Sequence, residues 1–248
     1  MRSQAKQAGG DIVSHLGNHE WMNLLGMSTG PCFIAVLLMH TSQVTGGMFT
    51  HTYITNHFND SSQSRYVHES EIKTFGSPAA RQKMLTTGRI GKAWATNYTT
   101  TSRVPLHPSL GAIDVDFDAS NAVAQSPIAN AVLSFVHGGL SPTFEYLTPY
   151  PSRINDIGKQ LLHRLQTPPF PLPHPPHPYS GMPMDSTVEE KSFYAADGPV
   201  WYRGWAMNPE EVACREVDDV LARIGVRRMI MGHTPDFHVS FAFSPLTR

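Results

Sequence analysis

Three short stretches of the chain place side chains that bind metals or transfer protons directly after an apolar run. The first holds an amide, an imidazole and a carboxylate at residues 18–20, the second holds His137, and the third holds His233. Glycine stands beside each of them, and glycine permits the sharp turns and the close backbone approach that a metal or phosphate site needs. The layout therefore indicates a site built from loops that follow strands; the apolar runs are residues 11–16, 131–136 and 226–231.

The same layout predicts an α/β fold, because open α/β sheets place their chemistry outside the carboxyl ends of their strands. A helix is expected over residues 152–166, with Ser152 as its N-cap and apolar residues at helical spacing. A second helix is expected over residues 209–224, and a third begins at Pro78. Residues 104–127 are mixed in character and are expected to form a loop.

Four blocks of sequence carry a resemblance to a known family. They are residues 17–23, which begin Gly-Asn-His-Glu, and residues 135–142, 198–204 and 232–235. In this order they resemble the motifs of the calcineurin-like metallophosphoesterases. Within that superfamily they are most similar to the Shewanella-like (bacterial-like) branch of the serine/threonine protein phosphatases. The resemblance covers roughly residues 1–26, 65–103 and 128–237.

This resemblance implies a two-sheet sandwich flanked by helices and an enzyme that hydrolyses phosphate monoesters with a metal-bound hydroxide. The family uses two divalent ions, manganese, iron or zinc, and such a pair clamps the phosphate. Asn18, His137 and His233 match three ligands of one ion, and an amide oxygen with imidazole nitrogens suits these metals. At most one metal site is recognisable in this sequence.

Three further residues match roles in the same family. His19 matches the acid that protonates the leaving oxygen. Arg203 matches the phosphate-binding arginine, whose planar fork can hold two phosphate oxygens, and Tyr202 is expected to line the same pocket. The expected substrate is a phosphoprotein or a small phosphomonoester. Members of this branch act on phosphotyrosine as well as on phosphoserine and phosphothreonine, so the substrate class stays open.

Other parts of the sequence depart from the family. Its two upstream motifs, Asp-x-His and Gly-Asp-x-x-Asp-Arg-Gly, are not in this sequence, so we expect impaired catalysis by this chain and missing strands at both ends of the fold. Residues 1–237 are interpreted as a partial phosphoesterase domain, and residues 238–248 as an unmatched tail. Within the domain, residues 27–64 are expected to be a non-family insertion, either translated intron or surface loop, and residues 167–183 a proline-rich loop.

The composition bears on partners and location. A net charge of −1 and a pI near 6.9 give no general attraction to nucleic acid or to an anionic membrane. The most apolar run, residues 31–39, is too short to cross a bilayer. Cys32 and Cys214 show neither metal nor disulfide spacing, which favours a reducing, intracellular and cytoplasmic location.

Alternative interpretations stay open. The chain could be a non-catalytic relative that binds phosphate or one metal without turnover. Residues 168–178 repeat a P-x-x-P spacing, which is a weak signal for an SH3-type ligand. Asp114 and Asp116 lack the glycine and the glutamate of a calcium loop, but they are candidates to replace the absent metal ligands. His15 and His163 are expected at the surface or in loops.

Overall fold

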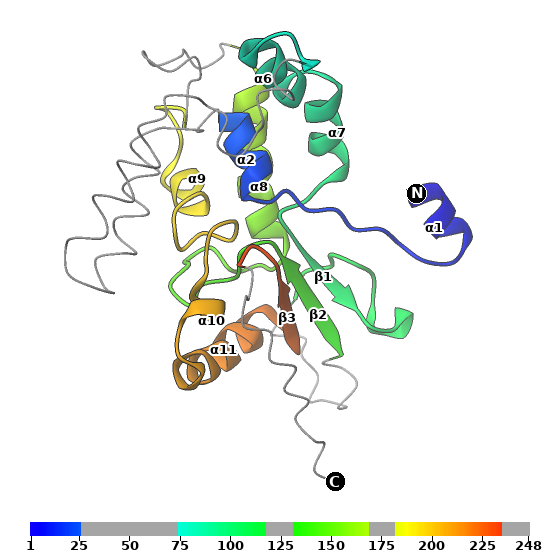
Figure 1. The fold of residues 1–248 in the computed structure, drawn as a ribbon. Coiled ribbons are helices and arrows are strands. Elements are labelled where there is room, and N and C mark those ends of the chain that lie inside the picture. The colour runs from blue at the N-terminus through cyan, green and yellow to red at the C-terminus, as the bar shows by residue number, and fades with distance from the viewer. Residues whose placement is uncertain (26–73, 118–130, 169–181, 235–248) are drawn as a thin grey trace, which may run out of the picture.

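A mixed three-stranded sheet and a long helix, α8, organise the fold. The structure is a computed structural model, and it describes residues 1–25, 74–117, 131–168 and 182–234. Strand β2 (Val132–Val136) lies between β1 (Thr101–Pro105) and β3 (Arg228–Met231) (Figure 1). It pairs antiparallel with β1 and parallel with β3. The chain is therefore an α/β protein, as expected.

The helices of the described residues gather mainly around α8. Helices α2, α6, α7 and α9 all contact it (Figure 1). The bounds of the helices are α1 Arg2–Gln7, α2 Asn18–Leu25, α6 Pro78–Thr86, α7 Arg89–Asn97, α8 Ser152–Gln166, α9 Val188–Phe193, α10 Gly204–Met207 and α11 Glu210–Ile224, with a 3-10 turn at Pro108–Leu110.

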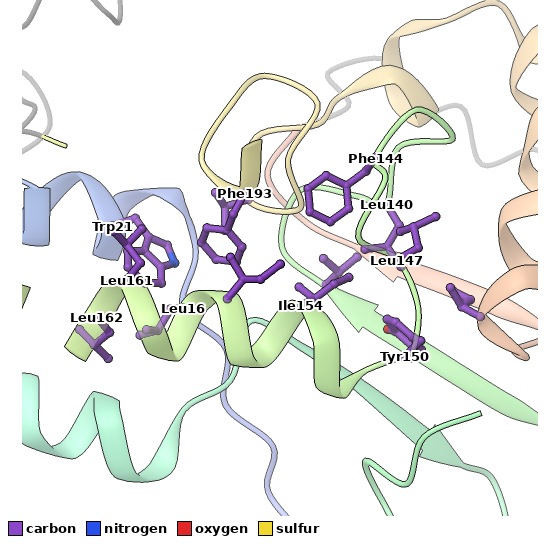
Figure 2. Close-up of a cluster of buried hydrophobic side chains, with 14 of the residues drawn as sticks. Leu16, Trp21, Leu140, Phe144, Leu147, Tyr150, Ile154, Leu161, Leu162 and Phe193 are labelled. Carbon is purple, nitrogen blue, oxygen red and sulfur yellow. The ribbon is translucent and has the colours of Figure 1, made fainter. Parts of the chain in front are cut away.

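Helix α8 supplies one wall of the hydrophobic core. Its apolar residues recur three and four positions apart, so they lie along one face of the helix, and all of them are buried. Trp21 of α2 and Phe193 of α9 meet edge to face above this helix, with ring centroids 5.2 Å apart (Figure 2). The core thus fixes α2, whose first turn carries Asn18 and His19, against the rest of the domain.

The expected cap of α8 is wrong in one detail. The N-cap is Pro151, and Ser152 is already the first helical residue. The carboxylate of Asp116 performs the capping instead, because it accepts hydrogen bonds from the Ser152 backbone N–H at 2.9 Å and from the Ser152 hydroxyl at 2.6 Å. A carboxylate is favourable there because it faces the positive end of the helix dipole.

Strand β1 was not expected, since residues 104 and 105 fall in the segment interpreted as a loop. Its first residues, Thr101 and Ser102, are polar and fully buried. Asn155 of α8 satisfies the backbone here: its amide oxygen accepts from Thr100 N–H and Thr101 N–H, and its NH₂ donates to the Thr101 carbonyl. A strand stabilised by polar contacts with a distant helix has no apolar alternation for the sequence to display.

The buried hydroxyl of Tyr150 joins β1 to β2. Its oxygen lies 2.6 Å from Thr101 Oγ1 and 2.5 Å from Ser134 Oγ. Burial raises the pKa of Tyr150 to about 12, from an ordinary value of 10.0. The folded chain therefore keeps this proton at pH values where the unfolded chain has lost it.

The free energy of unfolding is expected to fall as the pH rises from 10 to 12. As the pH rises, Tyr150 loses its proton in the unfolded state before it does so in the folded state, and this deprotonation stabilises the unfolded state. A pKa difference of two units corresponds to about 3 kcal/mol. Chemical denaturation at a series of alkaline pH values measures this loss, and Tyr150→Phe is expected to flatten the dependence. A slope that is the same in wild type and in this variant would contradict the assignment.

One expected strand differs from the structure, and several other expectations concern residues or a second sheet that the structure does not describe. The expected strand over residues 11–16 is reduced to an isolated bridge between His15 and Thr99. The described residues contain one sheet, so the second sheet of the sandwich stays a prediction. Residues 27–64, most of 167–183 and the tail at 238–248 lie outside the described residues. Across the described ranges, no helix is long and apolar enough to cross a membrane.

Candidate functional site

Three donor atoms from three separate elements meet at one point of the structure. Asn18 is the first residue of α2, His137 follows β2, and His233 follows β3. Asn18 Oδ1 lies 2.7 Å from His137 Nε2 and 3.1 Å from His233 Nδ1, and the two nitrogens are 3.1 Å apart. The structure thus brings together the three residues that the sequence suggested as metal ligands. We call them the donor triangle.

The donor triangle cannot be explained by hydrogen bonds alone. An amide oxygen only accepts, and each nitrogen of a neutral imidazole either donates or accepts. If both nitrogens donate to Asn18 Oδ1, two N–H groups face each other; any other assignment loses a contact to the oxygen. Reversing the amide leads to the same conflict. No arrangement of protons satisfies all three contacts, whereas one cation can accept a lone pair from all three atoms.

Local backbone structure holds each member of the triangle in place. A Cβ at Gly17 would lie 2.9 Å from the His137 ring, so glycine is required for the ring to pack there. The carboxylate of Glu20 accepts from Gly17 N–H at 2.8 Å, which caps the amino end of α2. Gly232 N–H donates to the His137 carbonyl at 3.0 Å, which extends the parallel pairing of β2 and β3.

His233 has a left-handed backbone conformation, with φ of 63°. Non-glycine residues adopt it at a cost of roughly 1–2 kcal/mol, although histidine is among the types enriched there. Such strain is often found at functional sites. Here the conformation belongs to the residue whose ring nitrogen completes the donor triangle.

Both imidazoles of the triangle hold protons weakly. The pKa of His233 is lowered to about 3, chiefly by burial and also by the positive Arg203 and the neighbouring His137 and His19. Burial is also the main cause that lowers the pKa of His137, while the carboxylate of Glu20 opposes it. Both rings are therefore neutral at neutral pH, which is the state that a metal ligand requires.

Arg203 and His19, the predicted phosphate-binding residue and acid, both lie near the triangle. Arg203 donates from Nη1 to the His233 carbonyl and to Thr234 Oγ1, both at 3.0 Å. His19 follows Asn18 in the first turn of α2 and is exposed. Its charge lowers the pKa of both His137 and His233, so it lies near both rings.

Tyr202 is the predicted site residue with the weakest link to the triangle. Its ring packs edge to face against Trp205, with centroids 5.5 Å apart, and its hydroxyl bonds to Ser141. Trp201, which the sequence did not single out, lies closer: its ring centroid is 5.6 Å from that of His233. Trp201 could have been singled out from the sequence, because it lies two residues before Arg203 in the block 198–204 that resembles the family.

The candidate replacement carboxylates are engaged elsewhere. Asp114 accepts from Ser102 and from Arg103 N–H, and Asp116 caps α8. Within the described part of the chain, no three or more His, Cys, Asp and Glu side chains gather in a way that could hold a metal ion. The donor triangle, with its amide, is thus a neutral set of ligands beside a positive Arg203.

Comparison with known proteins shows a similar fold but does not assign the chain to a family. No model of a known protein family matches the chain. An uncharacterized protein of Schizosaccharomyces pombe is 26% identical over 241 residues, a match that covers 96% of this chain and 49% of that protein. The solved structure of a point mutant of a cold-active protein tyrosine phosphatase is similar, with a TM-score of 0.51 and 17% sequence identity.

The structural match covers 94% of this chain and 47% of the phosphatase chain. The match indicates a phosphatase-like fold, coarsely similar to that of this protein tyrosine phosphatase. It spans about half the length of both proteins that it matches. The finer resemblance to the calcineurin-like superfamily stays a prediction.

Proposed function

We propose that this chain carries the metal- and phosphate-binding part of a metal-dependent phosphatase that hydrolyses phosphate monoesters. The donor triangle is the observation that carries the proposal, because its three contacts cannot all be hydrogen bonds. The fold shared with a protein tyrosine phosphatase supports it. The proposal includes the two-sheet sandwich of the calcineurin-like enzymes and a phosphoprotein or small phosphomonoester as the substrate. It also includes a cytoplasmic location and no nucleic-acid or membrane partner.

Asn18, His137 and His233 would hold one divalent ion, for which manganese, iron and zinc are candidates. When bound, such an ion supplies charge neutralisation for the phosphoryl oxygens and lowers the pKa of a coordinated water. The residues fit this role: the amide oxygen and the two neutral imidazoles present their lone pairs to one another across 2.7–3.1 Å. Asn18 is 4% exposed, so the ion would be shielded from water on that side.

Arg203 would bind the phosphate. Its contacts with the His233 carbonyl and with Thr234 fix the guanidinium beside the triangle before any ligand arrives. A planar guanidinium can donate two parallel hydrogen bonds to phosphate, which lysine cannot reproduce. The same charge that disfavours protonation of His233 would thus attract the anion.

His19 would donate a proton to the leaving oxygen. It is exposed at the amino end of α2, where a bound substrate can reach its ring. It lies close enough to influence the pKa of both His137 and His233, so a phosphate held at the triangle would be near its ring. Proton donation by a positioned side chain contributes about 10²–10⁴-fold to a rate.

Hydrolysis of p-nitrophenyl phosphate by the full chain with Mn²⁺ tests the proposal. The wild type is expected to turn over, and His19→Ala is expected to reduce kcat by about 10²–10⁴-fold while Mn²⁺ still binds. His163→Ala is the control, because His163 is an exposed histidine of α8. Equal activity in wild type and His19→Ala would contradict the role of His19.

A second candidate is a non-catalytic protein that binds phosphate or one metal. The neutral donor set favours it, because the described residues bring no carboxylate into the triangle to complete a second metal site. The same assay separates the two functions. Mn²⁺ binding by the wild type without any turnover would support the second candidate and contradict catalysis by this chain.

A further inference from the structure

A chain of hydrogen bonds connects Asp114 to His15 through Ser102. His15 Nε2 lies 3.0 Å from Ser102 Oγ, and Ser102 Oγ donates to Asp114 Oδ2 at 3.2 Å. Asp114 is fixed at its other oxygen, because Oδ1 accepts from Arg103 N–H at 2.8 Å while Asp114 N–H donates to the Arg103 carbonyl at 2.8 Å. Ser102 is fully buried. His15 was expected in a loop or at the surface, yet it is half-buried and bonded.

The direction of every bond in this chain follows from the carboxylate. A carboxylate only accepts, so the Ser102 hydroxyl must donate its proton to Asp114. The Ser102 oxygen is then left to accept from His15, which requires the proton of the neutral imidazole to be on Nε2. Asp114 thus selects one tautomer of a histidine that is 99 residues away in the sequence.

His15 in turn belongs to the segment that delivers Asn18. Residues 14–16 are attached to Thr99, which lies two residues before β1, by two backbone hydrogen bonds: Leu16 N–H donates to the Thr99 carbonyl, and Thr99 N–H donates to the Ser14 carbonyl. His137 is carried by β2, whose Val136 pairs with Thr101 of β1. The segment from Thr99 through β1 is therefore the common frame for Asn18 and His137. The His15–Ser102 bond is a third attachment of the Asn18 segment to that frame, and the one made to β1 itself.

We propose that Ser102 is a positioning residue for the donor triangle, acting through its hydrogen bond to His15, and that Asp114 sets the direction of that bond and with it the Nε2–H tautomer of His15. The proposal rests on the proposed metal site. Groups one step removed from the ligands commonly change metal affinity 10–100-fold, because they decide whether the ligands stand ready in one geometry.

Asp114→Asn is the most informative substitution. Asparagine tolerates the left-handed backbone of Asp114, whose φ is 62°, so the fold is expected to persist. Arg103 N–H still needs an acceptor, so the amide oxygen stays on it and the NH₂ group faces Ser102. The NH₂ then donates to Ser102. The Ser102 hydroxyl is expected to donate to His15 Nε2, 3.0 Å away, in preference to Thr99 Oγ1 at 3.4 Å, so the tautomer of His15 is expected to switch to Nδ1–H.

Long-range ¹H–¹⁵N correlation spectra of the ¹⁵N-histidine-labelled full chain report this tautomer directly. The wild type is expected to show His15 as Nε2–H, Asp114→Asn as Nδ1–H, and Ser102→Ala as a mixture. Ser134→Ala is the matched control, because Ser134 is also a fully buried serine of the sheet but bonds to Tyr150 instead. An Nε2–H signal that persists in Asp114→Asn would overturn the proposal.

Mn²⁺ affinity of the same four proteins tests the consequence for the site. Ser102→Ala, which removes the His15–Ser102 bond, is expected to bind Mn²⁺ about tenfold more weakly than wild type. Asp114→Asn, which keeps that bond with its direction reversed, and Ser134→Ala are expected to bind Mn²⁺ as the wild type does. Wild-type affinity in Ser102→Ala would overturn the positioning role while leaving the metal site intact. Absence of Mn²⁺ binding by the wild type would instead overturn the proposed function and the positioning role together, so the two failures are distinguishable.

Discussion

His137→Ala is expected to lower the affinity of the chain for Mn²⁺ by at least about 100-fold. Its Nε2 contacts both other members of the donor triangle, at 2.7 Å and 3.1 Å. Removal of this ring leaves Asn18 and His233 with one contact, which an ordinary hydrogen bond from His233 Nδ1 can satisfy. Only two of the three atoms that would bind the ion then remain, and the hydrogen bond between them competes with metal binding.

Titration with Mn²⁺, followed by the electron paramagnetic resonance signal of the free ion, measures this loss. His163→Ala is the control, since it removes an exposed imidazole of α8 whose hydrogen-bond partner is Thr167 rather than a member of the triangle. Thermal unfolding of both variants checks that the domain is intact. An affinity in His137→Ala within about threefold of the wild type, with the fold preserved, would be incompatible with the metal site.

Arg164→Met is expected to destabilise the fold by roughly 3 kcal/mol or more. Arg164 Nε donates to both oxygens of Glu190, at 3.1 Å and 3.2 Å, and the Glu190 side chain is completely buried. The same carboxylate accepts from Thr187 N–H in the capping box of α9. Methionine fills a similar volume but leaves a buried carboxylate without its counter-charge, which is the costly case.

Two variants separate the charge from the packing. Asp185→Asn removes the other partner of Arg164, but Asp185 is 73% exposed, so an effect below about 1 kcal/mol is expected. The double variant Arg164→Met/Glu190→Gln removes both charges and is expected to recover part of the loss. Chemical denaturation measures all four proteins. Equal stability of Arg164→Met and Asp185→Asn would contradict the account.

The parts of the fold with a regular sequence pattern were predictable. Helix α8 has the expected bounds because five apolar residues recur at helical spacing, and β2 follows from a short apolar run closed by glycine. Asn18, His137 and His233 were grouped through their resemblance to family motifs, and the structure places them together. Periodicity alone would not have grouped residues that are 96–215 positions apart.

What could not be predicted depends on polar contacts between distant residues. Strand β1 is fixed by Asn155 and Tyr150, and its buried Thr101 and Ser102 resemble loop residues in the sequence. Asp116 was a candidate metal ligand, but it caps α8. His15 illustrates the same limit, because its partner Ser102 lies 87 residues away. Single polar contacts of this kind leave no periodic signal in a sequence.

The most direct test of the donor triangle is the number of Mn²⁺ ions bound per full chain after loading and removal of the excess. Our account predicts one ion for the wild type and none for His137→Ala, with inorganic phosphate strengthening binding because Arg203 holds the anion beside a neutral ligand set. A wild-type chain that retains no ion, or one that retains its ion undiminished in His137→Ala, would contradict the metal site on which the proposed function rests.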